Sequence, residues 1–106
     1  MLYSDIDPIL GPWAKTHGLF VATHFKDTEV RSIQIVDDAG DSYQLWVSIP
    51  QEGVSVSVSF ADHGARSRKI QTFATCLEEL GQTLESAFAV AELWIRERGH
   101  TRTPVF

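Results

Sequence analysis

One long amphipathic segment near the C-terminus constrains the fold of this chain more than any other feature. Between Thr75 and Gly99, apolar residues recur every three or four positions, which places them on one face of a helix. Thr75 and Glu78 have the spacing of a capping box, and Gly99 supplies a left-handed residue at the helix end. The segment predicts a helix about 35 Å long, enough to lie across a small sheet. The apolar positions are Leu77, Leu80, Leu84, Ala87, Phe88, Ala91, Trp94 and Ile95.

Four shorter segments upstream have the composition of β-strands. They cover residues 19–25, 30–36, 42–49 and 54–60, and short polar or turn-forming loops separate them. Loops this short between consecutive strands indicate an antiparallel meander. Residues 54–60 read VSVSVSF, so the valines and Phe60 face one way and the serines face the other. This alternation predicts a sheet with one buried face and one face in water.

The remaining segments complete a two-layer α+β sandwich with the order α-β-β-β-β-(β)-α. An N-terminal helix begins at Asp7-Pro8 or Gly11-Pro12 and ends at Gly18. Residues 68–73 form either a fifth strand or a backward extension of the long helix, and the capping box favours the strand. We expect an antiparallel four- or five-stranded meander with both helices packed on one face, in a single domain over residues 1–106. Residues 99–106 are expected to form a loosely held tail.

The composition is that of a compact globular protein. The chain has 106 residues, of which 43% are hydrophobic, and no apolar run reaches the ~20 residues of a membrane-spanning helix. Its first residues lack the basic and apolar segments of a signal peptide. The single cysteine, Cys76, fits a reducing compartment. We therefore expect a cytoplasmic protein.

The charge distribution argues against nucleic acid as a partner. The net charge is −5, and residues 1–62 hold nine acidic residues against three basic ones. Residues 63–106 hold five acidic and six basic residues. An acidic first half opposes the phosphate backbone and suits solubility or a basic partner.

The sheet face opposite the helices is the main candidate binding surface. The two-residue period places on it Phe20, His24, Gln44, Trp46, Ser55, Ser57 and Ser59. Large aromatic residues surrounded by small polar ones are typical of protein-binding surfaces. Two alternatives remain open: the C-terminal tail or a symmetry-related copy of the chain covers Trp46, or a one-residue shift in register places Trp46 in the core.

A basic segment after the fourth strand is a second candidate. His63, Arg66, Arg68 and Lys69 could bind phosphate or a carboxylate-rich partner. We expect this segment to lie apart from the arginines at the end of the long helix. Those arginines are Arg96, Arg98 and Arg102.

No local pattern in the sequence indicates catalysis, a metal or a cofactor. The acidic turn, Asp37-Asp38-Ala39-Gly40-Asp41, lacks the ligand spacing of a calcium loop and predicts a solvated hairpin turn. Cys76 has no thiol partner nearby, and a nucleophile would need a base that the sequence does not place beside it. The histidines, none at metal-binding spacing from another, are His17, His24, His63 and His100.

These observations favour a non-catalytic protein-binding module, an adaptor, inhibitor or immunity-like protein of bacterial type. It would use the sheet face around Trp46 or an edge strand, and an edge strand could also join two copies into a homodimer. The alternative is a small-ligand-binding or catalytic domain with His24 or His63 in a pocket between sheet and helices. A third hypothesis, nucleic-acid contact by the basic segment, requires binding that weakens steeply with salt.

Overall fold

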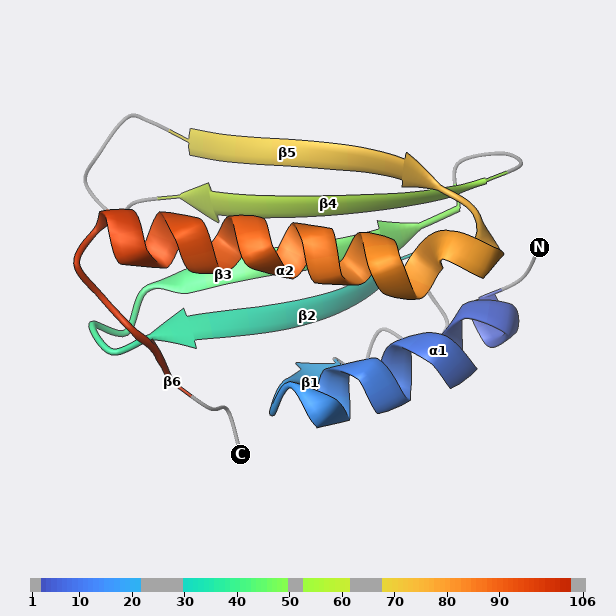
Figure 1. Cartoon of the computed structure of the whole chain (residues 1–106), viewed down its shortest axis with the longest axis horizontal. Coiled ribbons are helices and arrows are strands. Elements are labelled where there is room, and N and C mark those ends of the chain that lie inside the picture. The colour runs from blue at the N-terminus through green and yellow to red at the C-terminus, as the bar shows by residue number, and fades with distance from the viewer. Residues whose placement is uncertain (1–2, 22–29, 50–52, 62–67, 104–106) are drawn as a thin grey trace.

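The fold of this protein is a single antiparallel sheet with two helices packed on one side. The structure is a computed structural model that describes residues 3–21, 30–49, 53–61 and 68–103. Strands β1 to β5 follow one another across the sheet in chain order, and β6 pairs with β2 (Figure 1). The predicted two-layer α+β architecture is confirmed. The elements are α1 (Tyr3–Thr16), β1 (Phe20–Val21), β2 (Val30–Asp37), β3 (Ser42–Ser48), β4 (Val54–Ala61), β5 (Arg68–Thr75), the 3₁₀ turn η1 (Leu77–Glu79), α2 (Leu80–Glu97) and β6 (Arg102–Thr103).

The core lies between the sheet and the helices, as the alternation in β4 predicts. The valines of β4 are almost fully buried on the helix-facing side, and α2 contributes the residues of its predicted apolar face. Leu77 and Trp94 from that face are only partly buried at its edge. Fully buried side chains from the sheet and both helices include Ile6, Leu10, Ile33, Ile35, Tyr43, Leu45, Val56, Val58, Leu80, Leu84 and Ile95.

The long helix begins later than predicted, and the prediction of a capping box at its start is wrong. Thr75 is the last residue of β5 and pairs with Val54, because the sheet ladder continues to that point. Cys76 takes the cap position of η1 without a side-chain cap hydrogen bond. The Thr75 hydroxyl instead accepts a hydrogen bond from Thr83 Oγ1 at 2.7 Å. The predicted end is confirmed, since Gly99 has a φ of 74°.

The first helix begins earlier than predicted and contains both prolines. Pro8 and Pro12 lie four residues apart on the exposed side of α1, so the carbonyl groups that lose a helical donor are on the side that faces water. The opposite side buries Ile6, Leu10 and Ala14, each no more than 1% exposed. This burial offsets the cost of the prolines, which local sequence rules could not include.

Arg31 fixes α1 against the sheet. It lies on the helix-facing side of β2, opposite Val47, and is only 6% exposed. Its Nε donates a hydrogen bond to Asp7 Oδ1 at 2.9 Å. A cation at this depth needs such a carboxylate, and Asp7 therefore connects the middle of α1 to β2.

Residues 68–75 form the fifth strand, which resolves the ambiguity in favour of the sheet. All eight residues of β5 pair with β4, from Arg68 opposite Ala61 to Thr75 opposite Val54. α2 then runs back along the sheet in the opposite direction to β5 (Figure 1).

The segment after Gly99 is held against the sheet, and the prediction of a loose tail differs from the structure there. β6 pairs with the end of β2, with Thr103 opposite Val36 and Arg102 opposite Asp37. Asp38 accepts hydrogen bonds from the backbone N–H and the hydroxyl of Thr101. These contacts join positions more than 60 residues apart, so no local pattern could predict them.

Candidate functional site

The outer face of the sheet carries the predicted surface residues in two neighbouring rows. One row runs Ser32, Trp46, Ser57, Thr72 across β2 to β5. The next row runs Gln34, Gln44, Ser59, Ile70. Trp46 is half-buried at the centre of this face, so the register shift that would place it in the core is wrong.

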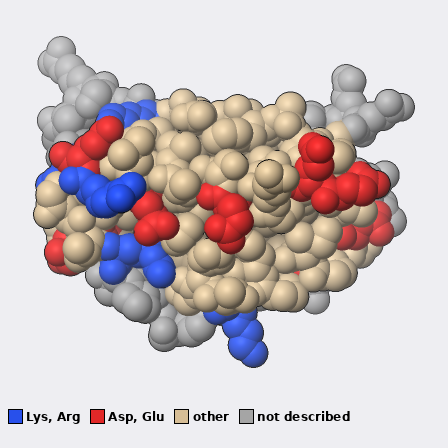
Figure 2. Space-filling view, in the orientation of Figure 1, with Lys and Arg blue, Asp and Glu red and all other residues tan. Residues whose placement is uncertain are grey.

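The outer face is almost free of charge. Among its positions in the described strands, none is Asp, Glu or Lys, and Arg68 at the start of β5 is the single basic residue. The helix side is different, because acidic and basic side chains are spread over it and most of the visible basic ones gather where α2 ends (Figure 2). In a chain with 22% charged residues, this makes the two sides chemically distinct.

Hydrogen bonds between strands order the polar side chains of the outer face. Gln34 Nε2 donates to Ser42 Oγ at 2.7 Å, and the hydroxyls of Ser57 and Thr72 lie 3.0 Å apart. Ser59 is 6% exposed although it points away from the helices. Hydrogen bonds therefore hold part of the polar surface around Trp46 in place before a partner binds, which lowers the entropy cost of binding.

Phe20 and His24 complete the predicted set only in part. Phe20 pairs with Gln34, so its register position is on the outer face. His24 lies outside the described residues. Ser55 joins the outer face beside Trp46, opposite Ser48 and Ala74.

The described part of the basic segment, Arg68 and Lys69, lies nearer to the end of α2 than the sequence predicts. His63 and Arg66 lie outside the described residues, and Arg68 begins β5. Lys69 Nζ contacts Glu97 Oε2 at 3.2 Å and lies 5.8 Å from the centre of the Trp94 ring. Because β5 and α2 run in opposite directions, the start of β5 lies beside the last turn of α2. The expected separation of the basic segment from the end of α2 is therefore wrong for Lys69.

The acidic turn holds a buried carboxylate, which corrects the expectation of a solvated turn. The Asp37 side chain is fully buried, and its Oδ1 accepts hydrogen bonds from the backbone N–H groups of Ala39 and Asp41. Its Oδ2 accepts one from the Tyr43 hydroxyl and lies 2.8 Å from His100 Nδ1. Four partners thus surround a single carboxylate.

These contacts change the ionisation of Asp37 and Tyr43. Burial alone would raise the pKa of Asp37, but hydrogen bonds from His100 and from the Asp41 and Ala39 backbone outweigh it and lower the pKa. Burial, together with the nearby Asp37 charge, raises the pKa of Tyr43 to about 12. Both shifts favour an ionised Asp37 beside a neutral Tyr43.

The same cluster contains side chains that can bind a metal ion. Asp37, Asp41 and His100 each offer a ligand atom, and these atoms lie within 4.8 Å of one another. The Asp37 oxygens are already occupied by four donors, and Asp41 Oδ2 is 2.8 Å from Arg98 Nη2. A divalent cation would have to displace an arginine and the hydrogen bonds that shape the turn. These side chains are therefore better suited to holding the turn in place than to binding a metal.

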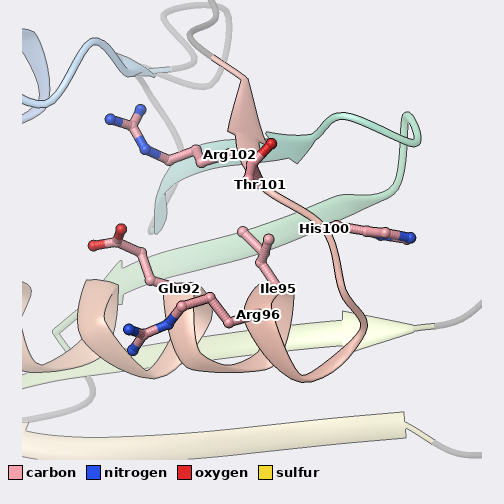
Figure 3. A pocket seen from close by; sticks show the side chains of 6 residues that line it. All are labelled: Glu92, Ile95, Arg96, His100, Thr101 and Arg102. Carbon is pink, nitrogen blue, oxygen red and sulfur yellow. The ribbon is translucent and has the colours of Figure 1, made fainter.

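A hollow beside the C-terminal segment has a volume of about 230 Å³. Figure 3 shows its lining, with Ile95 between the charged side chains of α2 and the segment from His100 to Arg102. Arg102 reaches away from it, donating to the His17 carbonyl oxygen at 2.8 Å and lying 5.3 Å from the centre of the Phe88 ring. The space is smaller than the ~300 Å³ at which metabolite pockets begin.

A second histidine also has a partner that its sequence spacing does not show. His17 Nε2 lies against Glu85 Oε1, which also accepts a hydrogen bond from Trp13 Nε1 at 2.8 Å. Hydrogen bonds from His17 and then Trp13 lower the pKa of Glu85. His17 directly follows α1 and Glu85 lies on α2, 68 residues away, so this contact joins the end of α1 to α2 through tertiary packing alone.

Comparison with known proteins gave no match to a protein-family model, to a curated protein or to a solved structure. Neither helix in the described part of the chain is long and apolar enough to cross a membrane.

Proposed function

We propose that this protein is a non-catalytic protein-binding module and that the outer sheet face around Trp46 is its contact surface. One observation carries the proposal: a half-buried tryptophan at the centre of a nearly uncharged face of serine, threonine and glutamine. Tryptophan is enriched among the residues that contribute most to binding energy, and small polar neighbours can form the surrounding rim.

The chemistry of the face also limits the partner. A surface with so few charges gains little from electrostatic steering, so its partner would present a neutral, polar and aromatic surface. Binding is then expected to change little with salt concentration. A partner of the basic segment, by contrast, would be lost as salt is raised. The proposed function, that of an adaptor or an immunity-like inhibitor, uses the salt-insensitive binding of the sheet face.

The test is a nuclease-treated pull-down from an extract of the source organism, read by mass spectrometry. Trp46→Ala should remove a stoichiometric partner that the wild type retains, with a loss of affinity of about 30-fold or more, the equivalent of about 2 kcal/mol. Gln44→Lys should do the same, because it places a charge on the neutral face at an exposed position. Ala89→Lys adds the same charge on the exposed side of α2 and should retain the partner.

A thermal melt of each variant separates binding from folding. Trp46→Ala should lower the melting temperature by less than about 15 °C, since the Trp46 side chain is not part of the buried core. A fall of more than about 15 °C would assign Trp46 a role in the core instead. A partner that remains bound to both Trp46→Ala and Gln44→Lys would contradict the proposed surface.

A further inference from the structure

β5 forms one long edge of the sheet. Within the described residues, its eight positions pair with β4 alone, while the opposite side of the sheet ends in the two-residue strands β1 and β6, both paired with β2 (Figure 1). An edge strand of this length presents a row of backbone donors and acceptors to a further strand. The edge has no proline and no glycine to interrupt that row.

The exposed apolar side chains gather near this edge. Ile70 of β5 is 54% exposed and Leu93 of α2 is 46% exposed, and these are the exposed large hydrophobic residues of the described chain. Leu93 follows Ser86 by seven residues, about two helical turns, so both lie on the same side of α2. Ser86 lines a hollow of about 330 Å³ together with Phe73 and Ala74 of β5. Exposed apolar side chains therefore lie on both sides of the sheet beside β5, Ile70 on the outer face and Leu93 on the helix side.

We propose that β5 pairs antiparallel with β5 of a second copy of this chain, with Thr72 opposite Thr72. Opposed residues in an antiparallel pair share a sheet face, and a strand that pairs with itself through a two-fold axis satisfies this rule. Ile70 then lies opposite Ala74 of the second copy, and the exposed isoleucine is covered. The two Thr72 side chains form a favourable cross-strand pair on the outer face.

The helix-facing side of the edge fits the same register. Gln71 lies opposite Phe73 of the second copy, and Lys69 lies opposite Thr75. The hollow beside Phe73 is lined by Glu79, Gln82, Thr83 and Ser86, so it offers polar partners to a glutamine and a carboxylate to a lysine. The long polar side chains of one copy thus enter the hollow of the other.

Charge selects the antiparallel direction and a second copy as the occupant. β5 begins with Arg68 and Lys69, and Glu78 and Glu79 follow its end. Antiparallel pairing brings the basic start of one copy to the acidic end of the other, whereas parallel pairing would align like charges. Lys69 contacts Glu97 of its own chain, and both side chains are about half exposed. Replacing this ion pair with one to the second copy therefore costs little free energy.

The dimer forms independently of the partner proposed for the sheet face, but it would strengthen binding to that partner. Its two-fold axis is perpendicular to the sheet, so both outer faces lie on the same side of one continuous sheet. The two Trp46 side chains would then face one partner assembly together, which raises binding strength by avidity when the partner is itself repeated.

Light scattering after size exclusion, over a range of protein concentrations, tests the association. The wild type should elute with twice the chain mass, and Ile70→Lys should elute as a folded monomer. Gln44→Lys places the same charge on the outer face away from β5 and should remain dimeric. A wild type that is monomeric at about 100 μM, equivalent to a dissociation free energy under 6 kcal/mol, overturns the proposal. A dimer that persists in Ile70→Lys overturns it as well.

Disulfide trapping tests the register. In a Cys76→Ser background, Thr72→Cys should form a crosslinked dimer on oxidation, because directly opposed residues have the spacing that a disulfide needs. Ala74→Cys is the matched control, since residue 74 lies opposite residue 70 and four positions from its own equivalent. Crosslinking at residue 74 and not at residue 72 would contradict the register. A dimer whose partner remains bound to both Trp46→Ala and Gln44→Lys shows that the proposed partner surface alone fails. A monomeric wild type whose partner is lost with Trp46→Ala shows that the proposed dimer alone fails.

Discussion

The Asp37 carboxylate lies in a sequence of turn-forming residues, yet its side chain is fully buried. It accepts hydrogen bonds from the backbone of its own turn and from the Tyr43 hydroxyl, and it contacts His100, which follows α2 in the chain. A buried carboxylate with this many donors stabilises the native state only while it is ionised. A single residue therefore makes the fold sensitive to acid.

Asp37→Asn is expected to lower the unfolding free energy at pH 7 by about 2–4 kcal/mol, because it removes the charge that His100 and the turn backbone bind. The pKa of Asp37 is lower in the folded state. Its contribution is therefore present above its ordinary pKa, near pH 4, and is lost as the pH falls from there through the lowered folded value. Urea unfolding at several pH values should show a shallower acid-side loss in Asp37→Asn than in the wild type.

Asp38→Asn serves as the control for this experiment. Asp38 lies in the same turn but is exposed, and its contacts are to Thr101. Its acid-side profile should follow that of the wild type. If Asp37→Asn and the wild type lose stability equally as the pH falls, the carboxylate does not have the role assigned to it.

At the scale of the elements, each helix shows where local rules hold and where packing overrides them. α2 ends at Glu97, and the positive φ of Gly99 closes the helix end there, with backbone hydrogen bonds from Gly99 to Arg96 and from His100 to Ile95. Its start instead follows the β5 ladder, which keeps Thr75 in the sheet. α1 retains two prolines because its opposite side is buried.

The glycines give a prediction at this scale with its own control. Gly11 in α1 and Gly81 in α2 lie within helices, and a Cβ at either position would meet nothing within 4 Å outside its two chain neighbours. Gly81→Ala should stabilise the protein by about 0.5–1 kcal/mol, since alanine loses less backbone entropy. Gly11→Ala should gain less, because Gly11 precedes Pro12 and the proline ring disfavours the helical backbone for a residue with a Cβ. Gly99→Ala should destabilise it by about 1–2 kcal/mol, because its φ of 74° is left-handed. Chemical denaturation measures all three, and a gain in stability from Gly99→Ala would contradict the end of α2.

At the scale of the whole molecule, the segment after α2 joins parts that are far apart in the chain. His100 and Thr101 bind the turn between β2 and β3, and Arg102 binds the end of α1. α1 otherwise depends on Arg31, on the His17 and Trp13 contacts with Glu85, and on its apolar side. The C-terminal segment therefore contributes to holding α1 on the sheet.

Arg102→Ala should lower the unfolding free energy by about 1–2 kcal/mol, through loss of the hydrogen bond to the His17 carbonyl and of the packing on Phe88. Hydrogen exchange should then become faster in α1 while β3 and β4 keep their protection. Arg96→Ala, at an exposed position of α2, is the matched control and should leave both unchanged. Equal acceleration across the whole sheet would show that Arg102 does not act on α1 in particular.

The sequence by itself determined the layers of this protein, because period and turn chemistry act over a few residues. The alternation VSVSVSF separates Val56 from Ser57, the short loops specify a meander, and the spacing from Leu80 to Ile95 defines the buried side of α2. The same alternation placed Gln44 and Trp46 on one outer face, although their role in binding stays a prediction.

Only the tertiary structure decided which distant side chains meet. Asp37 and His100 are 63 residues apart, and His17 and Glu85 are 68 apart, so no spacing rule links them. The ladder that holds Thr75, the burial that tolerates Pro12, and the pairing of Arg102 with the end of β2 likewise depend on the assembled sheet. Local periodicity selects a face for each residue, whereas the partner on that face is set by the packing of the whole chain.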